Sequence, residues 1–130
     1  MRGIEDFEDE DLLLGACTPE APCGAYAQEV FVSAGVTPSI DTEEAKVTDV
    51  VAKVAAGELD AGIVYVTDVV ANDDEVDGVE VPAAVNVDAV YPIATVAEAP
   101  SPDGGAAFVA YVLSDQAQQV LADYGFLPPS

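Results

Sequence analysis

The stretch that decides the fold reads LLLGACTPEAPCG at residues 12–24. Its first half, Leu12–Cys17, predicts a short buried strand, and Thr18–Pro22 predicts a turn. A helix is predicted from Cys23 to the residue before Gly35, which suits the left-handed conformation that ends many helices. The apolar residues that recur there at helical spacing are Ala27, Val30, Phe31 and Ala34.

The alternation of strand and helix continues downstream. A second helix is predicted from Asp41, which can cap it with Glu44 three residues on. Its apolar stripe consists of Val47, Val50, Val51 and Val54. Residues 61–66 are rich in β-branched side chains and predict a strand beneath that stripe. Thr67 and Asp68 then offer capping side chains to a short helix from Val69. This order predicts an α/β fold with a mixed, largely parallel sheet flanked by helices.

The chain divides into three parts by composition. Residues 1–11 are strongly acidic and predict a solvated lead-in, and residues 12–98 predict the α/β lobe. Residues 99–130 begin with a linker rich in Pro and Gly, in which Ser101-Pro102 resembles a helix cap. Two helices are expected after it, over residues 106–113 and after Ser114.

The charge balance excludes several classes of function. The chain carries 3 Lys and Arg against 25 Asp and Glu, a formal charge of −22, and no His. Affinity for nucleic acids and anionic membranes comes mainly from Lys and Arg, so neither is an expected partner. The absence of His excludes triad hydrolases and His-ligated zinc sites. Because 51% of the residues are hydrophobic, we expect a folded chain rather than a disordered acidic tail.

Membrane insertion is not expected either. The longest uncharged stretches, such as residues 104–114, fall short of a membrane span. No cationic, apolar signal segment opens the chain. We therefore expect a soluble protein.

Three segments place small or short groups where a predicted strand gives way to a helix: Pro22–Gly24, Lys46–Thr48 and Tyr65–Thr67. In open α/β sheets, ligands bind at the carboxyl ends of the strands, beside helix N-termini that favour anions. An anion site is one interpretation. The alternative is that these are ordinary connections that bind nothing, since most such turns carry no ligand.

Four motifs occur in the order typical of one protein family: Cys17–Ala27, Gly57–Asp68, Tyr91–Ala94 and Asp123–Phe126. Each motif alone is weak, but the ordered combination is specific. From about residue 12 to residue 128, the chain resembles the C-terminal half of the molybdate-binding proteins of bacterial ABC transporters.

The resemblance implies a two-lobed, type II periplasmic binding fold that closes on tetrahedral molybdate or tungstate outside the cytoplasm. It implies that the backbone N–H groups of Cys23 and Val47 and the hydroxyl of Tyr65 bind the oxyanion, without direct protein-to-metal bonds. The family's other ligands are two hydroxyl-bearing residues in an N-terminal portion that has no counterpart here. The chain would then hold half a site, and its C-terminal helices would return to the missing lobe.

The same resemblance implies a solute-binding component that delivers its ligand to ABC permease subunits, with no enzymatic activity and no cofactor. Apolar faces left by the missing lobe favour self-association of the chain. Two alternatives remain open. The chain can belong to a binding protein for another oxyanion, such as sulfate, or be an acidic domain, adapted to high salt, that docks on basic partners without a small ligand.

Cys17 and Cys23 are separated by five residues across one turn. Outside the cytoplasm they can form a disulfide, to which chain entropy contributes only about 2 kcal/mol in so short a loop. Two free thiols are one alternative. A redox-active pair is another, although the spacing is not Cys-x-x-Cys.

Overall fold

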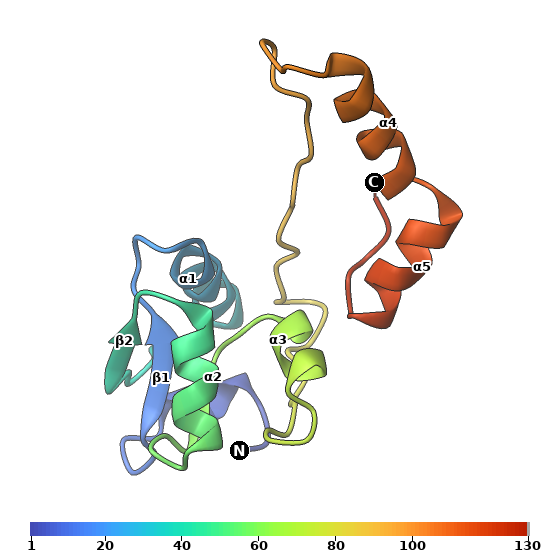
Figure 1. Ribbon diagram of the computed structural model, residues 1–130. Coiled ribbons are helices and arrows are strands. Elements are labelled where there is room, and N and C mark those ends of the chain that lie inside the picture. Colours follow the sequence, from blue (N-terminus) through green and yellow to red (C-terminus); the bar gives the residue numbers. More distant parts are fainter. Residues whose placement is uncertain (130) are drawn as a thin grey trace. The chain divides into compact units, whose positions relative to one another are not determined.

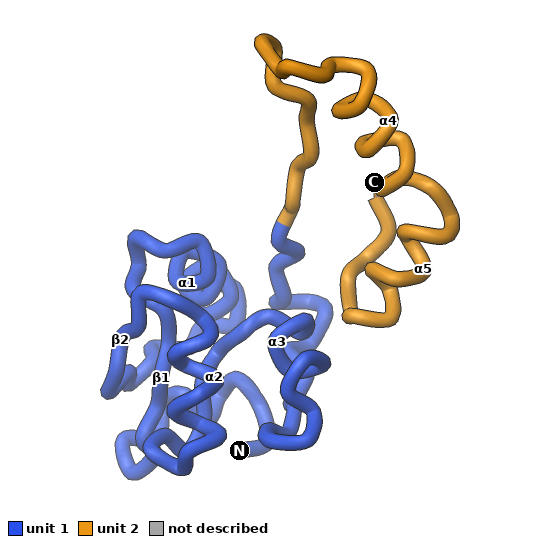
Figure 2. Tube along the Cα trace, viewed as in Figure 1, with its two compact units in different colours: residues 1–89 blue, residues 90–130 orange. Residues whose placement is uncertain are grey.

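A computed structural model describes residues 1–129 (Figure 1). The chain divides into two compact units, residues 1–89 and residues 90–130 (Figure 2), and each is described separately. The division falls before the linker predicted at residue 99.

A three-stranded parallel sheet forms the centre of the first unit. The central strand β1 (Leu14–Cys17) lies between β2 (Thr42–Glu44) and β3 (Ala61–Gly62). Cys17 pairs with Glu44 on one side of β1, and Gly15 pairs with Gly62 on the other. All residues of β1 are buried. The predicted α/β class and the parallel arrangement are confirmed.

Three helices accompany the sheet: α1 (Pro22–Ala34), α2 (Val47–Ala55) and α3 (Val66–Ala71) (Figure 1). As predicted, α1 ends at Gly35, whose φ of 69° is in the left-handed region. The helix buries Ala27, Val30 and Phe31, and the side chains of α2 that are buried are Val50 and Val51. The stripes predicted from sequence therefore do face the core.

The predicted start of the second helix is wrong. Asp41 does not cap a helix, because Thr42–Glu44 forms β2 instead, and α2 begins at Val47 after Lys46. The N–H and the carboxylate of Asp41, which a capping box would use, instead form hydrogen bonds with Leu14 of β1. The N–H of Asp41 donates to the carbonyl of Leu14 at 2.9 Å, and the carboxylate of Asp41 accepts from the N–H of Leu14 at 2.8 Å.

The strand predicted over residues 61–66 is also too long. β3 covers only Ala61–Gly62, and α3 begins at Val66 rather than Val69. The carboxylate of Asp68 accepts from the N–H of Tyr65 at 3.1 Å, and the N–H of Asp68 donates to the carbonyl of Tyr65 at 3.0 Å. These two bonds start the helix at the residue after Tyr65.

The opening acidic segment differs from the solvated lead-in that we expected over residues 1–11. Ile4–Glu8 form a short 3-10 helix, η1, whose two apolar side chains are in the core: Ile4 is 4% exposed and Phe7 is 3% exposed. The ring of Phe7 lies 5.1 Å from that of Phe31, centroid to centroid. Ile4 and Phe7 are three positions apart and anchor this charged segment to the core. The prediction missed them because carboxylates dominate the composition of the segment.

The second unit contains α4 (Pro102–Val112) and α5 (Asp115–Asp123). Ser101 and Pro102 occupy the predicted cap and first position, so α4 starts four residues before the expected residue 106. The hydroxyl of Ser114 caps α5 as predicted, accepting from the N–H of Ala117 at 3.4 Å. Among the described residues of this unit, Ala117 is the one buried hydrophobic side chain.

Candidate functional site

The carboxyl ends of the three strands share one edge of the parallel sheet, and a helix begins shortly after each strand. α1 follows β1, α2 follows β2 and α3 follows β3. Cys23 lies in the first turn of α1, Val47 is the first residue of α2, and Tyr65 is the cap residue of α3. The topology thus brings all three residues singled out from the sequence to the same edge.

At the start of α1, Cys23 provides the first backbone N–H. Pro22 occupies the first helical position and has no N–H, while the N–H groups of Gly24 and Ala25 both donate to the carbonyl of Ala21 at 3.0 Å. Helix geometry gives the N–H of Cys23 no acceptor within α1. It is therefore the donor that this helix can offer to an anion.

The turn before α1 packs unusually closely against it. A Cβ at Gly24 would lie 2.0 Å from the backbone carbonyl oxygen of Thr18 and 2.7 Å from that of Cys17. No larger residue fits there without moving the backbone. Gly24 thus lets the first turn of α1 rest directly on the loop that follows β1.

Cys17 and Cys23 form a disulfide, and the described part of the chain contains no free cysteine. Their Cα atoms are 5.7 Å apart. Of the three interpretations drawn from the spacing, the disulfide is the one that the structure has. The bridge ties the end of β1 to the first turn of α1, next to the N–H of Cys23.

At the start of α2, Val47 follows the extended residue Lys46. The N–H of Asp49 donates back to the carbonyl of Lys46 at 3.1 Å, so the N–H of Val47 precedes the first bond of the helix. Lys53, in the last turn, forms an ion pair with Glu44 at the end of β2. The hydrogen bond with Glu44 raises the pKa of Lys53 above its usual value.

The start of α3 is different, because the carboxylate of Asp68, in its first turn, accepts a hydrogen bond from the backbone there. Burial raises the pKa of Asp68, against the opposing effect of the hydrogen bond from the N–H of Tyr65. The backbone N–H of Tyr65 is thereby used inside the protein. Any contribution of Tyr65 to a ligand must come from its side chain.

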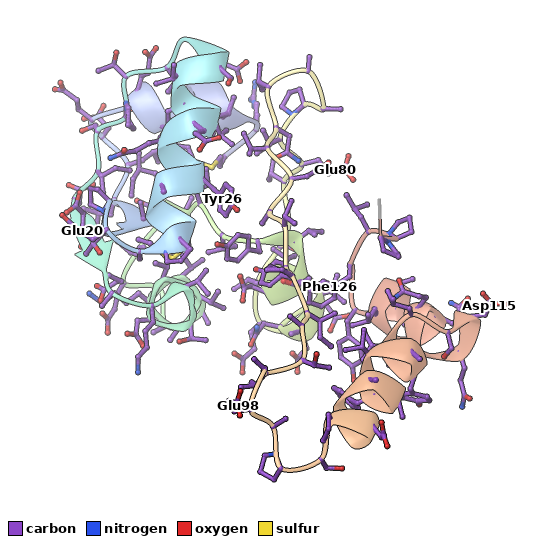
Figure 3. The ribbon with its side chains drawn as sticks, turned by 90° about the horizontal axis from the view of Figure 1, so that it is seen from above. Glu20, Tyr26, Glu80, Glu98, Asp115 and Phe126 are labelled. Carbon is purple, nitrogen blue, oxygen red and sulfur yellow. A yellow bond between two sulfur atoms is a disulfide. The ribbon has the colours of Figure 1, made fainter. Side chains whose placement is uncertain are left out.

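Tyr26 is a further residue at this edge that the sequence analysis did not single out. Its ring lies 6.4 Å from that of Tyr65, centroid to centroid, at an interplanar angle of 71°. Figure 3 labels it on α1. The signal that could have found it is its position three residues after Cys23, within the first motif, which places both on one side of the helix.

The described residues include neither a metal-binding cluster nor a membrane-spanning helix. Within residues 1–129, no three side chains of the His, Cys, Asp or Glu type gather closely enough to hold a metal ion. None of the helices in that range has the length and apolar character needed to cross a membrane.

Comparison with known proteins gives consistent matches. The model of the bacterial extracellular solute-binding proteins matches residues 1–127. The molybdate-binding protein ModA of Mycobacterium tuberculosis is 33% identical over 129 residues, which are 99% of this chain and 49% of that protein, and its Mycobacterium bovis counterpart matches equally. A putative ABC transporter substrate-binding lipoprotein of Bacillus subtilis, YvgL, is 31% identical over 92% of this chain and 46% of its own length.

A solved structure shares the fold. The substrate-binding domain of a putative molybdenum ABC transporter from Clostridium difficile superimposes with a TM-score of 0.79 at 23% identity, over 100% of this chain and 59% of that one. The fold is therefore that of a substrate-binding domain. The chain spans about half the length of the relatives it matches.

Proposed function

The chain belongs to the family of bacterial extracellular solute-binding proteins, and we propose that it is one lobe of a molybdate- or tungstate-binding component of an ABC importer. Molybdate is named for the mycobacterial relatives at 33% identity. The protein acts by binding a solute outside the cytoplasm and presenting it to permease subunits, not by catalysis, and it needs no cofactor.

One observation carries the proposal: Cys23, Val47 and Tyr65 each lie at the start of a different helix, at the carboxyl edge of one parallel sheet. Two of them offer backbone N–H groups from helix starts, and the third offers a hydroxyl. A tetrahedral oxyanion has four oxygens that accept such bonds, and each charge-assisted hydrogen bond contributes about 1.5–3 kcal/mol. Neutral donors of this kind hold a dianion without Lys or Arg.

The formal charge of −22 does not prevent this binding. Salt screens the field of the surface carboxylates within about 10 Å at 0.1 M ionic strength. The donors at helix starts act at hydrogen-bond distance, well inside this screening length, so salt weakens them much less. The acidity therefore concerns the solvent-facing surface more than the site.

We propose that the site is shared with an N-terminal lobe. The described donors contact one side of the ligand, and hydroxyl-bearing residues of the other lobe complete its coordination. In this arrangement residues 12–98 form the lobe itself, and residues 99–130 return to the other lobe. The exposed apolar side chains of α4 and α5 support this role, with Phe108 61% and Val120 52% exposed. Without that lobe, we expect the chain to self-associate through the same side chains.

The ligand is held by hydrogen bonds and not by protein-to-metal bonds. The residue before Pro22 is Ala21, which has no side-chain oxygen to coordinate a metal. Sulfate offers the same charge on a smaller tetrahedron. We expect the donors, fixed by three separate helices, to reject it by size.

Calorimetric titration tests the proposal. The 130-residue chain alone and the chain joined to the N-terminal half of the Mycobacterium tuberculosis relative are titrated with molybdate, tungstate and sulfate. We expect tight binding of the first two by the joined protein, weak or undetectable binding by the chain alone, and no binding of sulfate. A joined, folded protein that ignores molybdate and tungstate would end the proposal, and one that prefers sulfate would favour the alternative oxyanion.

A further inference from the structure

We propose that Tyr26 is the positioning residue for the Tyr65 hydroxyl in the oxyanion site. The inference rests on the proposed function and extends it to a residue outside the three donors. It starts from the contact between the two rings, at 6.4 Å and 71°.

The side chain of Tyr65 is contacted from outside its own helix. It lies before α3, which has only six residues and buries none of them. The carboxylate of Asp68 holds the backbone N–H of Tyr65, but this bond leaves the two side-chain torsions of the tyrosine undetermined. The ring of Tyr26 approaches from α1, a separate element, and supplies a contact at the side chain itself.

Tyr26 is attached to a firmly held part of the fold. The first turn of α1 rests on the preceding loop at Gly24, and the disulfide at Cys23 links the same turn to β1. The next residue, Ala27, is buried in the core. A ring carried by this turn is a fixed reference for a neighbour at the start of a short helix that has no fully buried residue.

The same placement couples two donors. Cys23 and Tyr26 are three residues apart on α1 and lie on one side of the helix, so one helical turn presents the N–H of Cys23 and the ring that contacts Tyr65. Tyr26 thereby fixes the distance between the α1 donor and the α3 donor. That distance determines which size of tetrahedral anion fits both.

The contact is an edge-to-face ring contact, which depends on the aromatic ring and not on a hydroxyl. Phe at position 26 should therefore preserve the function of Tyr26. Leu retains apolar bulk but loses the ring edge, so it should not. The pair Tyr26→Phe and Tyr26→Leu separates positioning by the ring from direct ligand binding by the Tyr26 hydroxyl.

The test uses isotopically labelled protein in two forms: the 130-residue chain without ligand, and the joined two-lobe protein titrated with sodium molybdate. Without molybdate, three-bond couplings report the side-chain rotamer of Tyr65. In the titration, amide shifts of Cys23 and Val47 report binding at the edge. The variants are Tyr26→Leu, Tyr26→Phe, Tyr65→Phe and the double variant Tyr26→Leu with Tyr65→Phe. Tyr111→Leu, in the second unit, is the matched control at an exposed tyrosine.

We expect a single Tyr65 rotamer in the wild type and in Tyr26→Phe, and rotamer averaging in Tyr26→Leu. Molybdate affinity should fall about three- to tenfold in Tyr26→Leu and stay unchanged in Tyr26→Phe and Tyr111→Leu. Because Tyr26 acts through the Tyr65 hydroxyl, the double variant should bind no more weakly than Tyr65→Phe alone.

Three results would overturn the inference: an unchanged Tyr65 rotamer in Tyr26→Leu, an equal loss of affinity in Tyr26→Phe, or losses that add in the double variant. The failure of the proposed function looks different. In that case the Cys23 and Val47 amides of the folded, joined wild-type protein do not respond to molybdate, while the rotamer measurement on the 130-residue chain still decides whether Tyr26 positions Tyr65.

Discussion

Gly24 and Val47 show how much of the site depends on single backbone positions. A Cβ at Gly24 would lie 2.0 Å from the carbonyl oxygen of Thr18. The close packing of the loop against α1 therefore depends on glycine at this one position. Val47 contributes a partly buried side chain to α2, but the function proposed for it belongs to its N–H. The informative substitutions at these positions are therefore those that alter the backbone or remove its N–H.

Proline at position 47 removes the proposed donor while keeping the helix. Position 47 is the first of α2, where proline is favoured, and Lys46 before it is already extended at φ −134° and ψ 140°. In the joined two-lobe protein, we expect Val47→Pro to weaken molybdate binding about ten- to a hundredfold, measured by calorimetry. The thermal midpoint should change little.

The matched control is Asp115→Pro, at the first position of α5, which also follows an extended cap residue. This variant should bind molybdate as the wild type does. Undiminished binding by a folded Val47→Pro protein would remove Val47 from the site.

Asp68 predicts a pH dependence of stability. Burial raises its pKa above the ordinary value of 3.8, so the folded protein holds this proton more tightly than the unfolded chain. Ionised Asp68 therefore costs stability at neutral pH, and the cost disappears as the pH falls through the raised pKa. The Asp68→Asn variant keeps an acceptor for the Tyr65 N–H and should be more stable than the wild type at pH 7. Below pH 3.8 the difference should vanish.

Urea unfolding at the two pH values measures this difference. Asp73→Asn, at an exposed position, is the control for the general relief of charge repulsion, which any removed carboxylate provides. If Asp68→Asn gains no more stability than Asp73→Asn at pH 7, burial of the Asp68 carboxylate is not the cause.

The helices and strands show where local pattern suffices. The C-terminal end of α1 was predicted from Gly35 and the N-terminal end of α5 from Ser114, because cap geometry depends on one or two residues. β2 was missed because a capping box and an edge strand both suit Asp41–Glu44. Only the presence of β1 as a pairing partner decides between them.

The connection from β1 to α1 gives a prediction about its disulfide. With Cys17 and Cys23 bridged, neither sulfur should react with a thiol reagent in the folded, unreduced chain. After reduction, both should be labelled on unfolding, and the free energy of unfolding should fall by about 2 kcal/mol. Mass spectrometry of the labelled protein is the readout. Rapid labelling of Cys23 without reductant would contradict the bridge.

The molecule as a whole combines strong acidity with an apolar interior. Among residues 1–129, the ion pair between Lys53 and Glu44 is the one salt bridge, against a formal charge of −22. Most carboxylates are therefore without a cationic partner and repel one another across the surface. In the second unit, apolar side chains such as Tyr111 and Leu127 are exposed, at 52% and 67%.

Stability should therefore depend on ionic strength. Raising the salt shortens the Debye length from about 30 Å at 0.01 M to about 3 Å at 1 M and screens the repulsion. We expect the thermal midpoint of the chain, followed by circular dichroism, to rise over this range and compactness to be lost at the low end. KCl and NaCl should act alike. Melting that is indifferent to either salt would show that repulsion does not limit the fold.

The sequence by itself determined the α/β class, the core-facing stripes of α1 and α2, and the caps of α1 and α5, whereas the three residues proposed as donors come from the resemblance to a known family. The class, the stripes and the caps depend on side-chain periodicity and on single cap residues, which are local, and the donors depend on the order of motifs along the chain. Only the tertiary structure decided that Asp41–Glu44 pairs with β1, that Ile4 and Phe7 enter the core, and that the ring of Tyr26 reaches Tyr65. Each of these depends on a partner distant in the chain, and pattern along the chain carries no information about which distant residue will be there.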